Sequence, residues 1–127
     1  MPVVSISVNE KMLQDIDKVQ EELGFSGRSE VIRAAARMLI ADAREKEKFT
    51  GEINSILLLI HNQEVESVVT RTKHDFEDIT TTQVHSHLKG GKCLEIFILE
   101  GEAERIKELV KCFLTSGKME YVKLIVA

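Results

Sequence analysis

The sequence predicts an α+β fold in two parts, and three observations support it. Residues 1–48 hold a short alternating apolar segment followed by two segments with helical spacing, a βαα order. Residues 49–127 read as strand, helix, strand, strand, helix and strand, the βαββαβ order of a ferredoxin-like unit. The chain of 127 residues is 43% hydrophobic and 30% charged, which is typical of globular proteins with one ordinary domain or two small ones.

The first part begins with a strand expected at residues 3–8, because apolar and polar residues alternate there. Val4, Ile6 and Val8 fall on one face of that strand, whereas Val3, Ser5 and Ser7 fall on the other. Asn9 is expected to cap a first helix that ends at Gly24. A second helix should open at Ser26 or Gly27 and continue into the charged tract at 41–48.

One strand and two helices are too few to form a core alone, and a lone strand is an unpaired edge. Pairing with the same strand of a second chain solves both problems, and the product is a ribbon-helix-helix dimer. Such a ribbon fits the DNA major groove. The candidate DNA contacts are Val3, Ser5 and Ser7 for base edges, and Arg28, Ser29 and Arg33 for phosphates. The alternative is that these side chains are ordinary solvated surface.

The elements of the second part follow from its apolar patterns. Strands are expected at 52–61, 79–88, 92–100 and 119–126, and helices at 62–75 and 101–115. The second of these helices places one apolar face toward the core, made of Ala103, Ile106, Leu109, Val110 and Phe113. The boundary between the two parts is expected at 49–51, which contains Gly51.

Four side chains that bind soft metals are spaced as H-x10-H-x-H-x5-C. They are His74, His85, His87 and Cys93. His85 and His87 lie two apart on a strand and therefore share a face. Two imidazoles and a thiolate suit a late first-row divalent ion far better than magnesium or calcium. Taken alone, the His-x-His pair could equally be two exposed strand histidines.

The position of Cys93 depends on the hairpin loop. A three-residue loop at 89–91, with Gly91 left-handed, places His87 opposite Cys93. A two-residue turn would instead place Leu88 opposite Cys93 and the histidines on the other face. We expect the three-residue loop.

Two other residues of metal-binding type are expected to have structural roles. His61 is interpreted as an exposed histidine at a strand end rather than an auxiliary ligand, and Cys112 as a small buried hydrophobic side chain. Two cysteines do not make a disulfide framework.

Over nearly its whole length the chain resembles the NikR family of nickel-responsive regulators. The segment GRSEVIR (27–33) is similar to the opening of the family's second helix, and the four-ligand series is followed by Leu94 and Glu95 as in the family. The resemblance implies a DNA-binding arm at 1–48 and an ACT-like metal-binding and tetramerisation domain at 49–127. It implies one Ni(II) per subunit in a square-planar site, and a homotetramer built as a dimer of dimers.

The resemblance also implies individual roles. His85, His87 and Cys93 would come from one subunit and His74 from a neighbour, while Glu95 would accept a hydrogen bond from a ligand imidazole. Two positions depart from the family pattern. Val3 stands where many relatives carry a basic residue, which removes a potential guanine contact. Ala34, one turn after Glu30, removes half of an acidic pair that in the family can hold a second, weaker cation.

These observations predict a metal-responsive transcriptional regulator, most simply a nickel-dependent repressor of metal-uptake or metalloenzyme genes that binds a double-stranded operator with two half-sites. The net charge of −4, with neither half basic, means that DNA affinity must depend on local placement of a few residues. The absence of an apolar span or signal segment predicts a cytoplasmic protein with no membrane partner.

Two other functions are compatible with these residues, and a third is not expected. A copper or cobalt sensor would keep the fold and change the metal. A metal buffer or chaperone would use the arm only for dimerisation. An enzyme is not expected, because no nucleophile–base pair is evident and a site with four protein ligands leaves no open position for substrate.

Overall fold

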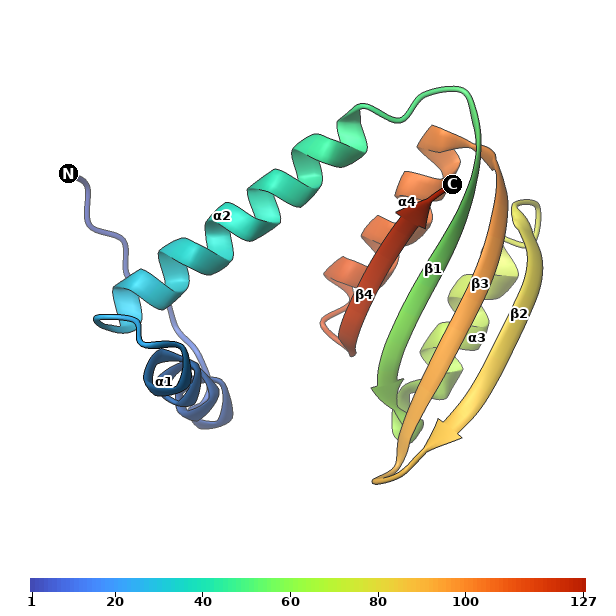
Figure 1. The fold of residues 1–127 in the computed structure, drawn as a ribbon. Coiled ribbons are helices and arrows are strands. Elements are labelled where there is room, and N and C mark those ends of the chain that lie inside the picture. Colours follow the sequence, from blue (N-terminus) through green and yellow to red (C-terminus); the bar gives the residue numbers. More distant parts are fainter. The chain divides into compact units, whose positions relative to one another are not determined.

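The computed structural model describes all residues from 1 to 127. The chain folds into two compact units, Met1–Glu45 and Lys46–Ala127, and most contacts lie within one unit or the other. Figure 1 shows two helices, α1 and α2, at the N-terminal side, and a sheet with two helices on one face in the second unit. The α+β fold class is confirmed.

The helices of the first unit begin and end where local chemistry predicts. In α1 (Glu10–Leu23) the Asn9 side chain accepts a hydrogen bond from the Met12 backbone N–H at 2.8 Å. Gly24 ends the helix in a left-handed conformation with φ 77°, and its N–H donates to the Gln20 carbonyl. The second helix, α2, spans Arg28–Glu47 and so begins one residue after the expected opening.

The strand expected at residues 3–8 is not formed in the single chain. These residues are exposed and carry no strand pairing. A strand exists only through hydrogen bonds to a neighbour, and no other part of this chain supplies one. The first unit also lacks a core, because Val31, 8% exposed, is its only buried side chain.

The second unit confirms the βαββαβ order. Its elements are β1 (Glu52–Asn62), a 3₁₀ turn (Gln63–Val65), α3 (Glu66–Asp75), β2 (Thr80–Leu88), β3 (Lys92–Glu102), α4 (Ala103–Thr115) and β4 (Met119–Val126). The strands form an antiparallel sheet in the order β2-β3-β1-β4. The last helix begins at Ala103 instead of residue 101, because Gly101 and Glu102 continue β3 by pairing with Ile53 and Glu52.

Alternation along the two central strands sorts their side chains onto two faces. On the helix-covered face, a core of buried side chains runs along the sheet; it includes Leu57, Leu59, Val69, Phe97, Leu99, Ile106, Leu109, Val110 and Phe113. At one end of the same face, the inward positions are taken by His61, Cys93 and Glu95, all nearly fully buried. A polar cluster therefore continues the hydrophobic core.

No element of the second unit covers the opposite face of the sheet, as Figure 1 shows. Its large exposed apolar side chains are Ile56, Val84, Leu88, Ile98, Tyr121 and Ile125. An apolar surface of this kind on a sheet marks an interaction site. Among the helices, none has both the length and the apolar content needed to cross a bilayer.

Candidate metal centre

The β2–β3 hairpin has the expected three-residue loop. His87 pairs with Cys93 and Leu88 with Lys92, so residues 89–91 form the connection. Gly90 and Gly91 both adopt positive φ values, 80° and 73°, which residues with a Cβ rarely adopt. The register prediction is confirmed, and it places His85, His87 and Cys93 on one face of the sheet.

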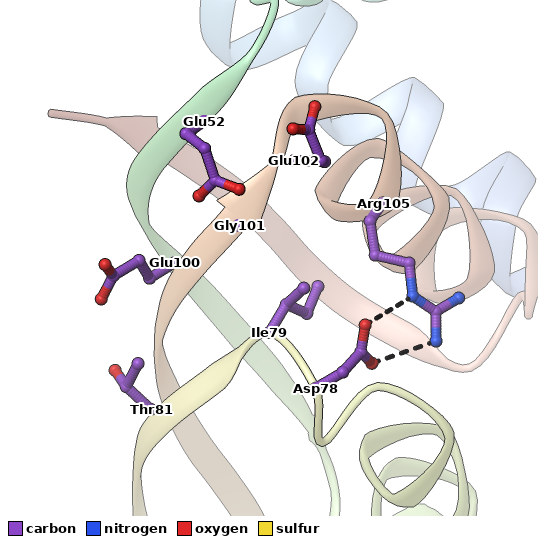
Figure 2. Close-up of a pocket in the computed structure, with 8 residues that line it drawn as sticks. All are labelled: Glu52, Asp78, Ile79, Thr81, Glu100, Gly101, Glu102 and Arg105. Carbon is purple, nitrogen blue, oxygen red and sulfur yellow. Dashed lines mark hydrogen bonds and ion pairs between the residues drawn. The ribbon is translucent and has the colours of Figure 1, made fainter.

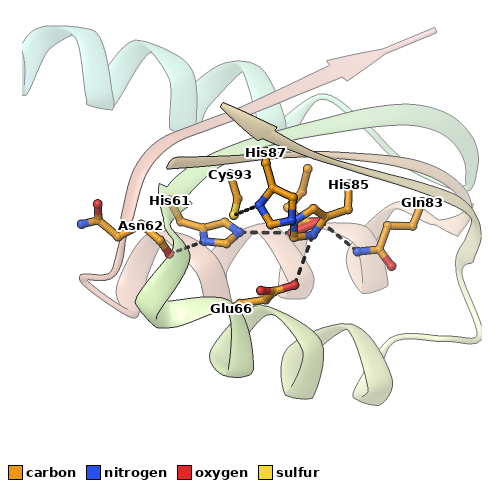
Figure 3. A network of polar contacts seen from close by, with 8 residues as sticks. His61, Asn62, Glu66, Gln83, His85, His87 and Cys93 are labelled. Atoms are coloured by element: carbon orange, nitrogen blue, oxygen red, sulfur yellow. Dashed lines mark hydrogen bonds and ion pairs between the residues drawn. The ribbon is translucent and has the colours of Figure 1, made fainter. Parts of the chain in front are cut away.

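The ligand atoms of these three residues lie within 4.8 Å of one another. Cys93 Sγ is 3.8 Å from His87 Nδ1, and the rings of His85 and His87 have centroids 4.9 Å apart. Figure 3 shows the three side chains converging beneath the hairpin. Cys93 is fully buried, His85 is partly exposed and His87 is exposed, so the cluster runs from the interior to the surface.

Carboxylates surround the cluster. Glu95 is 1% exposed, and its Oε1 lies 3.1 Å from His85 Nδ1 and 3.0 Å from the amide nitrogen of Gln83, which donates to it. Glu66, from α3, lies 3.5 Å from the same His85 nitrogen. The Nδ1 atom of His85 thus lies beside two carboxylates, and its other ring nitrogen, Nε2, is buried.

Two observations test whether the cluster fits a metal ion. The His85 Nε2 atom is buried and has no hydrogen-bond partner, which is costly unless something binds its lone pair. Burial raises the pKa of the Cys93 thiol, and the nearby carboxylates of Glu66 and Glu95 raise it further. A divalent cation would accept the orphaned lone pair and favour the thiolate. The N,N,S donor set suits a late first-row ion.

The fourth expected ligand, His74, lies outside this cluster. It is on α3 with 76% of its side chain exposed, and its Nδ1 is 3.1 Å from Glu77 Oε1. Within one chain, therefore, three of the four expected ligands come together and the fourth faces solvent.

Two expectations about single residues were wrong. His61 is completely buried rather than exposed, because it follows Leu57 and Leu59 at every second position of β1 and so continues the inward face. That alternation was the signal available in the sequence. Cys112 is exposed rather than buried, because it lies beside the apolar face of α4 and not on it.

The candidate DNA contacts all lie in the first unit. Val3, Ser5 and Ser7 are exposed on the unpaired N-terminal segment, and Arg28 and Ser29 stand in the first turn of α2. Arg28 donates two hydrogen bonds to Asp17, at 2.8 and 3.0 Å, and this lowers the pKa of Asp17. Arg33 pairs with Glu30. Both arginines are therefore held by carboxylates in the isolated chain.

Comparison with known proteins identifies the family. Residues 55–127 match the model described as the NikR C-terminal nickel-binding domain, and residues 3–43 match the ribbon-helix-helix family of the copG type. The chain belongs to the NikR family. Its sequence thus combines a ribbon-helix-helix segment and a NikR C-terminal domain, and the family assignment agrees with a regulator rather than an enzyme.

Individual relatives extend the match over most of the chain. A protein of Methanocaldococcus jannaschii named "Putative nickel-responsive regulator" is 33% identical over 127 residues, covering 98% of this chain and 90% of the relative. A protein of the same name from Halobacterium salinarum is 34% identical over 113 residues, covering 87% and 80%. An uncharacterized protein of Thermotoga maritima shares the fold, with a TM-score of 0.55 at 14% identity over 59% of this chain and 96% of that structure.

Proposed function

We propose that this NikR-family chain is a nickel-dependent DNA-binding regulator that represses genes for metal uptake or metalloenzymes. The observation that carries the proposal is the convergence of His85, His87 and Cys93, in which the buried Nε2 atom of His85 has no hydrogen-bond partner. Nitrogen and thiolate donors suit Ni(II), which would be held at one ion per subunit. The DNA partner implies that the protein acts in the cytoplasm.

The fourth ligand would come from a neighbouring subunit. His74 faces solvent on α3, where a second copy could receive it. The uncovered sheet face, with Ile56, Ile98 and Ile125 among its exposed side chains, supports association through the second unit. The arm supports a separate pairing, because residues 3–8 lack a partner within the chain. Two different pairings per chain build a homotetramer, a dimer of dimers.

The arms would bind DNA at two half-sites. Paired segments at 3–8 would enter the major groove with Val3, Ser5 and Ser7 outward, while Arg28, Ser29 and Arg33 would reach phosphates. Because Arg28 and Arg33 each hold a carboxylate in the free chain, binding DNA exchanges those pairs for phosphate contacts. Two linked arms then gain affinity from simultaneous engagement.

Metal would control DNA binding by favouring one assembly. A ligand shifts an equilibrium only by binding one state better than the other. An ion held by three side chains of one subunit and His74 of the next binds only the assembled arrangement, so it would favour the spacing of arms that the operator requires.

The test is DNA binding with and without nickel. An operator would be selected from a random DNA pool with the full-length protein and Ni(II), and affinity would then be measured by fluorescence anisotropy. We expect one equivalent of Ni(II) to raise operator affinity by roughly 5–150-fold, the usual range of allosteric coupling. Cys93→Ala should lose this response, while Cys112→Ala, which removes the exposed thiol, should keep it. Equal affinity with and without nickel in the unmodified chain would contradict the proposal.

Two alternatives have specific support. The same donors suit Cu(II), which generally binds nitrogen and sulfur sites more tightly than nickel, so a copper sensor, or a cobalt one, keeps the geometry and changes the ion. A competition series with Ni(II), Cu(II), Co(II) and Zn(II) separates these. A metal buffer or chaperone is favoured by the acidic net charge of −4, and selection of no sequence from the DNA pool under any metal would support it.

A further inference from the structure

His61 is a buried histidine that lies outside the proposed set of metal ligands. It lies on β1 directly opposite Cys93 of β3, with no exposed surface. Its ring centroid is 6.5 Å from that of His85. A histidine in the interior must satisfy both ring nitrogens, so its partners reveal what it does.

The hydrogen bonds of His61 fix where its protons lie. Nδ1 is 2.7 Å from the Asn62 carbonyl oxygen, which can only accept, so Nδ1 carries a hydrogen. Nε2 is 3.1 Å from Glu95 Oε2, and one proton is shared between these two atoms. That proton commits Oε2 of Glu95 to His61.

The other oxygen of Glu95 must then act as an acceptor. Oε1 receives the Gln83 amide hydrogen at 3.0 Å and faces His85 Nδ1 at 3.1 Å. Because Oε1 carries no proton of its own, His85 Nδ1 donates to it. The His85 ring is therefore in the tautomer whose Nε2 has a free lone pair, and Nε2 is the buried atom without a partner.

We propose that His61 is a positioning residue for the metal centre: it anchors Glu95, and through Glu95 it selects the His85 tautomer that offers Nε2 to the ion. This inference rests on the proposed metal-binding function. His61 itself does not contact the ion. Its contribution is preorganisation, since a ligand imidazole that is already oriented and correctly tautomeric binds without first rearranging.

The test compares variants of the full-length protein. His61→Phe keeps a ring in the interior but removes both hydrogen bonds, so Glu95 loses one of its anchors and His85 populates both tautomers. His61→Gln restores a donor toward Glu95. Leu57→Val, at an inward position of β1 that pairs with Phe97 and not with Glu95, weakens core packing away from this network and is the matched control.

Two readouts are needed. Ring ¹⁵N NMR of the metal-free protein reports the His85 tautomer, and competition with a chromophoric chelator reports Ni(II) affinity. We expect His61→Phe to produce mixed tautomers and to weaken nickel binding by roughly 10–100-fold, the usual effect of losing an outer partner of a ligand. His61→Gln should recover most of both, and Leu57→Val should match the unmodified chain.

Unchanged tautomer and nickel affinity in His61→Phe would overturn the inference, and so would an equal loss of affinity in Leu57→Val. Failure of the proposed function gives a different result: the unmodified chain would bind nickel weakly, while the NMR measurement, made without metal, would still show whether His61 controls His85.

Discussion

The contact between Gly101 and Ile79 gives the sharpest test of how the second unit packs. A methyl group added at Gly101 would lie 2.7 Å from Ile79 Cγ2 and 3.5 Å from Ile79 Cβ. Carbon atoms in normal contact are about 3.5–4.0 Å apart, so the overlap approaches 1 Å. Figure 2 shows Ile79 beside the backbone of Gly101. Ile79 is 4% exposed and packs in the core, so it has little room to move.

Gly101→Ala should therefore destabilise the unit substantially. Overpacking costs about 1–3 kcal/mol, and a φ of 159° adds backbone strain, for a total on the order of 2–4 kcal/mol. In urea unfolding followed by circular dichroism at fixed protein concentration, the midpoint should fall by about 1–2 M. The double variant Gly101→Ala/Ile79→Leu should regain stability, because leucine has no Cγ2 at that position.

Gly117→Ala is the control. Its φ is 69°, and an added methyl group would meet nothing within 4 Å, so this variant reports backbone strain without a clash. Equal midpoints for the two alanine variants, with no relief from Ile79→Leu, would refute the packing argument.

Three further predictions concern the hairpin, the acid stability and the arm. Deleting Leu88, with the 89–91 loop kept, places Ser86 opposite Cys93 and moves His85 and His87 to the other face, so nickel binding should vanish while far-ultraviolet dichroism persists; undiminished affinity in the titration would contradict this. Arg105 lowers the pKa of Asp78, so their pairing stabilises the fold above about pH 3.8, and the stabilisation is lost as pH falls through the lowered folded value. In Asp78→Asn the urea midpoint should therefore fall less between neutral and acid pH than in the unmodified chain. An equal fall in both proteins would show that the Arg105–Asp78 pair does not stabilise the fold. Arg33→Ala should weaken operator binding without changing nickel affinity, as measured by anisotropy and chelator competition.

Much of the fold could be predicted because short-range chemistry decides it. Asn9 and Gly24 set the limits of α1 through a side-chain cap and a left-handed residue. The length of the 89–91 loop set the β2–β3 register, and with it the faces of the three clustered ligands. Each of these features depends on residues close in sequence, so one chain is enough to define them.

The rest depends on long-range packing or on other molecules. The burial of His61 depends on which face of β1 the helices cover, although the alternation after Leu57 and Leu59 pointed to it. Cys112 is exposed because it lies beside the buried face of α4, at a margin where helical spacing alone does not decide burial. In the assembly we propose, residues 3–8 would pair with a second chain and His74 would bind metal in a second chain, and the residues of one chain do not define either arrangement.

The most direct test of the central claim is an absorption titration of the metal-free protein with Ni(II). We expect a thiolate-to-nickel charge-transfer band that saturates near one ion per chain, disappears in Cys93→Ala and persists in Cys112→Ala. Absence of the band, or a band that depends on Cys112 instead of Cys93, would contradict the assignment of the buried His85–His87–Cys93 cluster as the metal centre.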